Sequence, residues 1–238
     1  MIMPWLMRAL AIETSAEVAS LALFEDGQIV GALEHYEPER HAERIFGLLE
    51  QLFAQAPFGK EALDCLILGV GPGSFTGVRV GLALGQGVAA GLSLPMIGVT
   101  SLSALAAGAR PQAPASVLCP LLDARKGEVF AAAYDATGHE LVAPTVLAGE
   151  QVQEFFDQNL PTATLTFVGA IAQSLPLRSR VSRAPLSERP SAQTFWKALW
   201  PTGAASLEQA SLLAPRPVYV REPNLIVPKL VASPFQRP

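Results

Sequence analysis

The first half of the chain alternates between short apolar runs and longer segments with helical spacing. Short apolar runs and strict alternation predict strands, whereas apolar residues three and four positions apart predict helices. Asp26-Gly27 separates two alternating segments and therefore predicts a tight hairpin turn. The expected strands are 9–12, 18–24, 28–36, 63–70 and 96–99, and the expected helices are 38–53, 78–92 and one from Thr100 or Ser101 to Ala109.

A proline-containing linker at 110–114 separates this pattern from a similar second one. Three strand segments, a helix and a further strand then follow in the same order as in the first half. The sequence therefore predicts an α/β protein with two lobes, each built on a β-β-β-α-β plan. The expected strands of the second half are 117–122, 128–134, 140–142 and 163–168, and the expected helices are 150–159, 191–199 and 206–214. We assign residues 8–110 to an N-terminal lobe, 111–222 to a C-terminal lobe whose last helix can return to the first lobe, and 223–238 to a proline-rich tail.

An acidic residue closes the first strand of each repeated unit. Glu13 follows the strand 9–12 and Asp123 follows the strand 117–122, so we expect the two acids to occupy equivalent places. If the carboxylates of Glu13 and Asp123 faced each other across a cleft between the lobes, they would be candidates for acid–base chemistry.

The stretch from Leu66 to Gly81 is the most distinctive in the chain. An apolar run leads into the turn Gly71-Pro72-Gly73, and Ser74 or Thr76 then caps a helix. A glycine turn before a helix exposes backbone N–H groups that suit phosphate. The Walker and dinucleotide motifs are both incomplete, because the lysine and the third glycine that they require are absent. Arg79 is the only nearby cation, so direct phosphate contact, a structural turn and a partner surface all stay open.

Glycine recurs in that helix at Gly87 and Gly91 and, at every fourth residue near its start, at Gly77, Gly81 and Gly85. Each glycine costs the helix about 1 kcal/mol relative to alanine, and the spacing of four places all three on one face. The close approach of another backbone would offset this cost. We expect that backbone to belong to a partner or a second copy, bound beside the helix 38–53; the alternative is that the face packs on the chain's own sheet.

Composition narrows the classes of protein that fit. Half of the residues are hydrophobic and 16% are charged, which excludes an intrinsically disordered chain. The net charge of −4 argues against a protein that grips nucleic acid by itself. Cys65 and Cys119 sit in apolar runs and are expected to be buried free thiols. The longest weakly apolar stretch, 78–99, is too rich in glycine to favour a membrane span, and we expect a cytoplasmic protein.

Candidate metal and nucleophile sets are sparse in this sequence. The histidines, His35, His41 and His139, lack the close spacing of a metal site, and no Ser/His/Asp or Cys/His set can be placed. A group of arginines between 178 and 189 indicates either a solvated loop or a contact with an acidic partner or RNA. Its members are Arg178, Arg180, Arg183 and Arg189.

Four stretches of the chain together resemble one protein family. Gly71-Pro72-Gly73-Ser74-Phe75-Thr76-Gly77-Val78-Arg79 closely resembles the signature of the TsaB family, formerly called YeaZ. Leu10 to Ser15, Asp123 to Val129 and Pro217 to Arg221 fit the same family. The resemblance covers about Arg8 to Arg221, and its long central motif is specific, so the chain is identified as a member of this family.

The resemblance implies a two-lobed fold of the actin, sugar-kinase and Hsp70-like (ASKHA) type and a non-catalytic role in bacterial tRNA threonylcarbamoyladenosine synthesis. It implies binding to the catalytic subunit TsaD, recruitment of the small ATPase TsaE, and transfer of a threonylcarbamoyl group to adenosine 37 of tRNAs that read codons beginning with A. It also implies a homodimer when the chain is alone, contact with tRNA only through the complex, and ATP and a metal ion used by the complex rather than bound by this chain. Together with the glycine face, the resemblance implies a partner or dimer interface at Gly73, Ser74, Phe75, Thr76, Gly77, Arg79, Gly81, Gly85, His41 and Ile45. It also implies a vestigial nucleotide loop at Glu13, Thr14, Ser15 and Asp123. It implies no metal site.

The alternative reading is an enzyme of the same fold, a phosphotransferase or ATPase that works in the cleft between the lobes. Three departures from the pattern of working relatives speak against it. Glu13 stands where the family commonly has aspartate, the turn after Asp123 lacks glycines and carries the bulky Arg125, and no second histidine accompanies His41. Its candidate residues are Glu13, Ser15, Ser74, Thr76 and Asp123.

Overall fold

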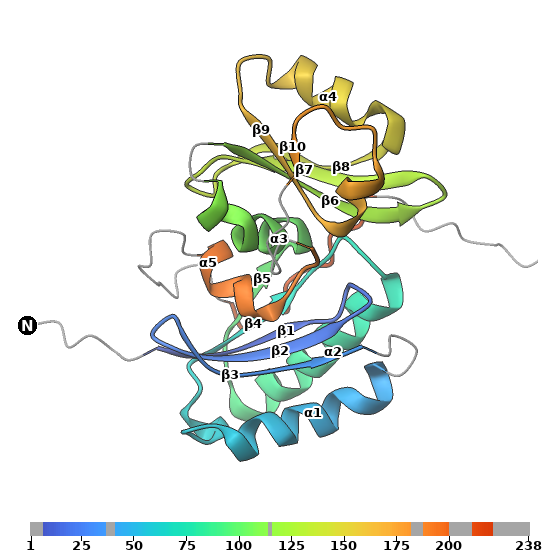
Figure 1. The fold of residues 1–238 in the computed structure, drawn as a ribbon. Helices are drawn as coiled ribbons and strands as arrows, with labels where there is room; N and C mark the ends of the chain where they lie inside the picture. Colours follow the sequence, from blue (N-terminus) through green and yellow to red (C-terminus); the bar gives the residue numbers. More distant parts are fainter. Residues whose placement is uncertain (1–6, 37–40, 114–115, 182–187, 200–210, 221–238) are drawn as a thin grey trace, which may run out of the picture.

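Two five-stranded sheets, one from each half of the chain, form the two lobes of the protein (Figure 1). The structure is a computed structural model that describes residues 7–36, 41–113, 116–181, 188–199 and 211–220. The strand order is β3-β2-β1-β4-β5 in the first sheet and β10-β9-β6-β7-β8 in the second. The strands of the first sheet are β1 (Arg8–Glu13), β2 (Ala19–Glu25), β3 (Gln28–His35), β4 (Cys65–Gly69) and β5 (Met96–Val99). Those of the second are β6 (Val117–Arg125), β7 (Glu128–Tyr134), β8 (Glu140–Ala148), β9 (Leu165–Val168) and β10 (Arg180–Val181).

The two sheets repeat one topology. In each unit the first strand, β1 or β6, pairs antiparallel with the second strand and parallel with the fourth. The third strand extends one edge in the antiparallel sense, and the fifth extends the other edge in the parallel sense. The predicted two-lobed ASKHA fold with a repeated β-β-β-α-β unit is therefore confirmed, and each unit carries a further strand beyond that plan.

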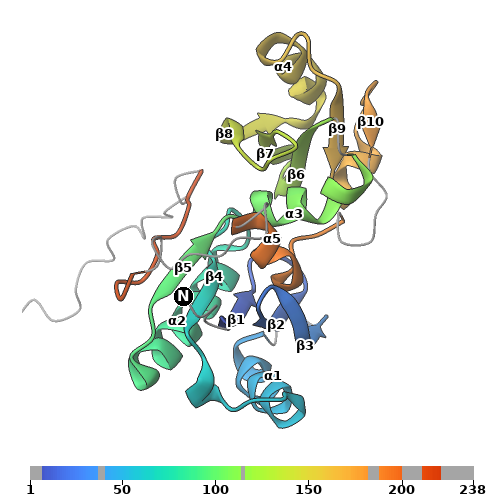
Figure 2. The same cartoon turned by 90° about the vertical axis from the view of Figure 1, so that its left-hand side faces the viewer.

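The helices form layers on the faces of the sheets (Figure 1, Figure 2). Helices α1 and α2 cover the outer face of the first sheet, α3 and α5 lie between the two sheets, and α4 covers the outer face of the second. The helices are α1 (His41–Gln55), α2 (Phe75–Leu92), α3 (Ser101–Ala109), α4 (Val152–Asn159) and α5 (Phe195–Leu199). Short 3-10 turns are η2 (Lys60–Ala62), η3 (Arg110–Gln112), η4 (Gly149–Gln151), η5 (Ala170–Ser174) and η7 (Ala192–Thr194).

Helix α3 joins the two lobes because it packs on both sheets. Its Ala104 belongs to the apolar cluster of the first sheet, and its Leu105 packs with Leu118 of the second. The small side chains of its sequence, SLSALAAGA, let two sheets approach one helix. The returning helix α5 also packs on the first sheet, where the ring of Trp196 lies 5.7 Å from that of Phe24.

Each unit contains a hairpin whose two-residue turn has positive φ angles. These angles are 52° at Asp26 and 79° at Gly27 in the first unit, and 56° at Lys126 and 78° at Gly127 in the second. Such turns match the twist of the flanking strands, and glycine at the second position adopts them without strain. The hairpin predicted at Asp26-Gly27 is confirmed.

Several predicted boundaries need correction. Helix α2 begins at Phe75 rather than at residue 78, and β8 runs to Ala148 rather than 142, because its ladder with β7 continues to the η4 turn. The helix predicted at 206–214 is wrong in its described part: Ser211 exchanges backbone hydrogen bonds with Met96, and the residues that follow to 214 are not helical. Residues 37–40, 114 and the tail 223–238, for which we predicted a helix start, a linker end and a proline-rich segment, lie outside the described residues.

Both cysteines are buried free thiols, as predicted. Burial, together with the charge of Asp64, raises the pKa of Cys65 to about 12, and burial also raises the pKa of Cys119. Neither thiol is therefore a reactive thiolate near neutral pH. Across the described residues, no helix combines the length and the hydrophobicity needed to cross a membrane.

Candidate functional site

The glycine turn after β4 is held between the β1–β2 loop and the start of α3. The Ser74 backbone N–H donates to Ser15 O at 2.7 Å, and the Ser101 N–H donates to Gly71 O at 2.8 Å. Ser74 is the N-cap of α2, and its hydroxyl accepts from the Gly77 N–H at 3.2 Å. The cap predicted at Ser74 is confirmed, and Thr76 instead lies inside the helix.

The glycine face of α2 packs on the chain's own first sheet. A Cβ atom placed on Gly77 or Gly81 would overlap atoms of Thr14, and one on Gly85 would overlap the side chain of Leu68. Thr14 Oγ1 in turn donates to Gly77 O at 2.7 Å, which draws the helix onto the end of β1. The prediction that these three glycines form a partner interface is therefore wrong, because the chain's own backbone at Gly77, and its own side chains at Gly81 and Gly85, occupy the space beside them.

The rest of the predicted interface divides between surface and core. Ser74, Phe75, Thr76 and Arg79 are exposed and stay candidates for a partner surface, whereas Gly73 is half-buried against Ser15. Ile45 is 1% exposed and belongs to the core beneath α1, so its assignment to the interface is wrong. His41 opens α1, and its side chain lies outside the described part of the chain.

Other glycines of the α1–α2 layer face outward. Around Gly47, Gly87 and Gly91, a Cβ atom would meet nothing within 4 Å. Phe46, next to Gly47 on α1, is 63% exposed. No contact among the described residues explains glycine at these helical positions, so this outer surface is a candidate for a close backbone contact. Sequence reasoning noted Gly87 and Gly91 in the glycine-rich helix but did not name them among the interface residues, and it missed Phe46 and Gly47.

A cleft of about 1100 Å³ opens between the lobes. Ser15, Ser74 and Asp123, three of the residues named for an enzymatic alternative, line it, whereas Glu13 and Thr76 do not. Its walls come from the glycine turn, the β6–β7 hairpin, η5 and the segment near residue 220. The other lining residues are Ala16, Glu17, Val18, Tyr36, Pro72, Gly73, Phe75, Leu121, Leu122, Ala124, Arg125, Phe130, Ala170, Ile171, Ser174, Glu188, Arg189, Pro190, Val218, Tyr219 and Val220.

Glu13 lies behind the cleft in a buried polar network. Its carboxylate accepts from the Ser15 N–H at 2.5 Å and from the Ser101 hydroxyl at 3.3 Å, and the two serine hydroxyls are 2.6 Å apart. Gly69 leaves room for it, since a Cβ atom there would lie 2.7 Å from Glu13 Oε2. The side chain is fully buried, and that burial raises its pKa, although hydrogen bonds from Ser15 and Ser101 oppose the rise. The candidate carboxylate pair of Glu13 and Asp123 across the cleft therefore does not form.

The buried Glu13 makes stability depend on pH. Its pKa is raised above its ordinary value of 4.5, so above pH 4.5 the folded state binds more protons than the unfolded state. The free energy of unfolding therefore falls as pH rises through that window, by no more than about 1.4 kcal/mol per pH unit. Glutamine can keep both contacts without titrating, because its oxygen accepts from Ser15 and its NH₂ donates to Ser101.

We therefore expect Glu13→Gln to gain stability relative to the wild type as pH rises from about 5 to about 8. Melting temperatures of the two proteins, followed by circular dichroism across that range, check the prediction. Parallel curves for the two proteins would show that Glu13 does not titrate differently on folding.

The second acid occupies a different place from the first. In the first sheet, the last parallel pair of β1 is Ile12 with Leu68, and Glu13 follows Ile12 directly. In the second sheet, the last parallel pair of β6 is Pro120 with Val168, and Asp123 comes three residues after Pro120. Asp123 therefore lies two residues further along its strand than Glu13 does. β6 continues through Asp123 to Arg125 and turns back at once, whereas five residues connect β1 to β2. Asp123 accepts from the Arg125 N–H at 2.7 Å. The expectation that the two acids are equivalent is therefore wrong, because a tight hairpin replaces the loop in the second lobe.

A segment near the chain's end is tied to the glycine turn. The Val218 N–H donates to Val70 O at 2.8 Å, and the ring of Tyr219 lies 5.4 Å from that of Phe75. Arg79 stacks on Phe75 at 3.7 Å from the ring centre and donates to Tyr219 Oη at 3.4 Å. Two motifs that are far apart in the sequence therefore build one exposed cluster at the mouth of the cleft.

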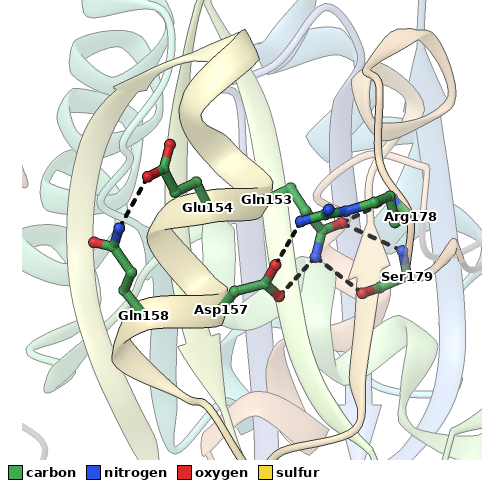
Figure 3. Close-up of polar contacts among 6 residues, drawn as sticks. All are labelled: Gln153, Glu154, Asp157, Gln158, Arg178 and Ser179. Atoms are coloured by element: carbon green, nitrogen blue, oxygen red, sulfur yellow. Dashed lines mark hydrogen bonds and ion pairs between the residues drawn. The ribbon is translucent and has the colours of Figure 1, made fainter.

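The described arginines of the second lobe bind acidic side chains of the chain itself. The Arg178 side chain donates to Asp157 Oδ2 at 3.0 Å, and the Arg178 backbone N–H donates to Gln153 Oε1. Asp157 and Gln153 both lie on α4 (Figure 3). Arg189 donates to Glu34 at 3.0 Å and stacks on Tyr36. An exposed pair such as Arg178–Asp157 contributes little to stability. The Arg180 side chain and Arg183 lie outside the described residues, so for these two arginines both alternatives, a solvated loop and a contact with an acidic partner or RNA, stay open.

Metal ligands do not gather in the described part of the chain. Its histidine, cysteine, aspartate and glutamate side chains include no group of three or more that could hold a metal ion. The groups nearest to the cleft are instead bound to one another, as in the pairs Arg189–Glu34 and Arg125–Asp123.

Comparisons with known proteins identify the family of the chain and agree with its fold. A profile of the family described as "TsaD: tRNA N6-adenosine threonylcarbamoyltransferase" matches residues 36–173. The chain is 39% identical to the Escherichia coli "tRNA threonylcarbamoyladenosine biosynthesis protein TsaB", in an alignment that covers 64% of this chain and 67% of that protein. It is 37% identical to the Haemophilus influenzae protein of the same name, and that alignment covers 51% of each. The matched part therefore spans between half and about two thirds of these relatives.

Solved structures extend the likeness over most of the chain. A Pseudomonas aeruginosa protein described as similar to peptidase YEAZ matches with a TM-score of 0.75 and 28% identity, over 90% of this chain and 100% of that one. A structure described as YeaZ from the same organism matches with a TM-score of 0.73 and 28% identity, over 90% and 99%. Sequence and fold agree, and the chain belongs to the TsaB (YeaZ) family.

Proposed function

We propose that this chain is a non-catalytic subunit in the synthesis of threonylcarbamoyladenosine in tRNA. The observation that carries the proposal is the 39% identity to the E. coli protein, which is named for that biosynthesis. The role would be to hold a TsaD-like catalytic subunit in a competent state. A TsaE-like ATPase would join the pair, and ATP and a metal ion would be used by the complex rather than by this chain alone.

The position of the acidic residues supports a non-catalytic role. Glu13, which stands at the end of β1, turns its carboxylate into a buried serine network and away from the cleft. In the second lobe, Arg125 and a two-residue turn occupy the place where a phosphate-binding loop would need open backbone. A substrate phosphate would therefore meet a crowded turn on one side and no carboxylate from Glu13 on the other.

The outer surface of the α1–α2 layer supports a role in binding a partner. It combines the exposed Phe46 with Gly47, Gly87 and Gly91, each of which leaves open space for an approaching backbone. An aromatic anchor beside small residues is typical of a protein interface. We assign the TsaD-like partner to this surface, and a second copy of the chain to the same surface when the partner is absent.

The substrate and the place of action complete the proposal. In the complex, the threonylcarbamoyl group would be transferred to adenosine 37 of tRNAs that read codons beginning with A. The chain's net charge of −4 favours contact with tRNA only through the complex, since nonspecific affinity comes mainly from cations that displace counterions. The reaction would take place in the cytoplasm.

Co-purification tests the proposal directly. A TsaD-like protein from the same organism, expressed with this tagged chain, is expected to elute with it. Addition of the chain to that protein, a TsaE-like ATPase, ATP and unmodified tRNA is expected to restore the modification. A catalytic subunit that is fully active without this chain would contradict the proposal.

A second candidate function, a phosphotransferase or ATPase, has one observation in its favour: Ser15, Ser74 and Asp123 do line a large cleft. We expect the isolated chain to hydrolyse ATP no faster than a buffer control, because Arg125 and the tight β6–β7 turn leave little room for a phosphate on that wall of the cleft. Release of phosphate, measured with and without Mg²⁺, checks this. Metal-dependent turnover that Asp123→Ala abolishes would establish the second candidate instead.

A further inference from the structure

Arg79 is the only charged residue of helix α2, and it is exposed. Its guanidinium lies 3.7 Å from the centre of the Phe75 ring, and its Nε donates to Tyr219 Oη at 3.4 Å. None of the acidic side chains in the described part of the chain forms an ion pair with it. Two aromatic residues therefore place a cation that no described acid neutralises.

The two aromatic residues hold this guanidinium in one orientation. The rings of Phe75 and Tyr219 lie 5.4 Å apart, and the hydrogen bond from the Val218 N–H to Val70 O anchors Tyr219 beside the glycine turn. A stacked arginine loses less conformational freedom when it binds, because its planar fork is already oriented. The terminal NH₂ groups of that fork have no hydrogen-bond acceptor among the described residues, and their geometry matches a carboxylate.

Arg79 lies on the same face of α2 as the partner surface proposed above. Arg79, Ala83, Gly87 and Gly91 are all exposed, and their spacing of four places them in one row. The distance from Arg79 to Gly87 along the helix axis is about 12 Å. An interface of standard size, about 800 Å² on each partner, spans that distance. A partner that covers Gly87 therefore also covers Arg79.

A guanidinium that a partner covers needs a charge of the opposite sign. A charge that is removed from water and left unpaired destabilises the complex strongly, whereas a hydrogen-bonded ion pair compensates for the lost hydration. Since the described residues of this chain supply no acid for Arg79, the partner has to supply it.

The charges of the α1–α2 layer favour a protein carboxylate over the phosphates of RNA. The charged residues of α1 are Glu43, Arg44 and Glu50, and all three are exposed. Together with Arg79, the two helices therefore carry two acids and two bases. A phosphodiester backbone is bound by an excess of cations, which this surface lacks.

We propose that Phe75, Arg79 and Tyr219 form a preorganised site for one aspartate or glutamate side chain of the TsaD-like partner. The site presupposes the proposed function, because it acts only when that partner binds. The carboxylate accepts two hydrogen bonds from the guanidinium of Arg79. Because α2 has one charge and the rest of its exposed row is uncharged, this pair sets the register of the partner along the helix.

Isothermal titration of the full chain with the purified TsaD-like protein tests the site. Arg79→Gln is expected to weaken binding about 10-fold or more, the effect of losing hydrogen bonds between charged groups. Arg79→Lys keeps the charge but not the planar fork, so an intermediate affinity is expected. The matched control is Arg178→Gln, which removes the same charge from a side chain that is 78% exposed in the other lobe, and which is expected to leave the affinity unchanged.

The salt dependence of binding separates a charge pair from a purely structural role. The affinity of the wild type is expected to fall as NaCl rises from about 50 to about 500 mM, and the Arg79→Gln protein is expected to show a shallower slope. Phe75→Leu removes the ring face beneath the guanidinium but keeps the cation. It is expected to weaken binding several-fold and to retain the salt dependence, because the ring orients Arg79 and carries no charge.

A charge exchange identifies the partner residue. Arg79→Glu is expected to abolish binding, and one of the partner's exposed acids, each replaced in turn by arginine, is expected to restore it. If the wild type binds but no exchange restores binding, or if Arg79→Gln binds as tightly as the wild type, the carboxylate site is wrong and the proposed function stands. If the wild type does not bind the TsaD-like protein at all, the proposed function fails and the site with it. Binding of a labelled single-stranded oligoribonucleotide that Arg79→Gln abolishes, with the partner affinity unchanged, would assign Arg79 to RNA instead.

Discussion

Replacement of Gly81 by leucine is expected to unfold the N-terminal lobe. A Cβ atom at this position overlaps Thr14 Oγ1, and Ile12 Cγ2 lies only 3.6 Å away, so a leucine side chain has no space between α2 and β1. Overpacking of this kind typically costs up to about 3 kcal/mol, a large part of the stability of a domain. Urea unfolding followed by circular dichroism measures the loss.

The matched control is Gly87→Leu, the same substitution six residues further along the same helix. Nothing lies within 4 Å of a Cβ atom there, and leucine is a better helix former than glycine by somewhat under 1 kcal/mol. The two variants are therefore expected to move the urea midpoint in opposite directions. A Gly81→Leu protein as stable as the wild type would show that the glycine face does not pack on the first sheet.

Gly87→Leu is in turn expected to abolish binding to the TsaD-like partner. If backbones meet at the outer surface of the α1–α2 layer, a leucine at Gly87 holds them apart and also displaces the contact around Gly91. The loss at a central position of an interface is about 2 kcal/mol or more, which corresponds to at least about 30-fold in affinity. Isothermal titration with the purified partner measures the affinity, and analytical ultracentrifugation measures the effect on the homodimer.

The control for binding places a leucine on the far side of the molecule. Gln158 is exposed on α4 and its side chain donates to Glu154 of the same helix, so Gln158→Leu is expected to leave the affinity unchanged (Figure 3). A Gly87→Leu protein that is folded and binds the partner as tightly as the Gln158→Leu protein would exclude the outer surface as the interface.

The sequence by itself determined the elements and the repeat of this protein. Apolar periodicity predicted β1, β2, β4, β5 and β7 to within about two residues, and Asp26-Gly27 predicted its hairpin. These features depend on a residue and its near neighbours along the chain, through side-chain spacing and turn geometry. The family resemblance likewise rests on contiguous motifs, and the comparisons agree with it.

Tertiary structure decided which side of each element faces inward. Along the chain, Gly81 and Gly87 look alike, yet a Cβ atom on Gly81 would overlap Thr14, whereas one on Gly87 would meet no described atom within 4 Å. Ile45 and Phe46 are adjacent apolar residues, and one is core while the other is surface. Helical spacing defines faces but does not say which of them meets the sheet.

The place of the two acids was also decided in three dimensions. Glu13 and Asp123 each follow an apolar strand, but the register with the parallel neighbour and the length of the next loop differ between the lobes. A shift of two residues, set by pairing with β4 and β9, puts one carboxylate in a buried serine network and the other on the cleft wall. Register and burial are properties of contacts between distant segments, and a single strand in isolation contains no information about them.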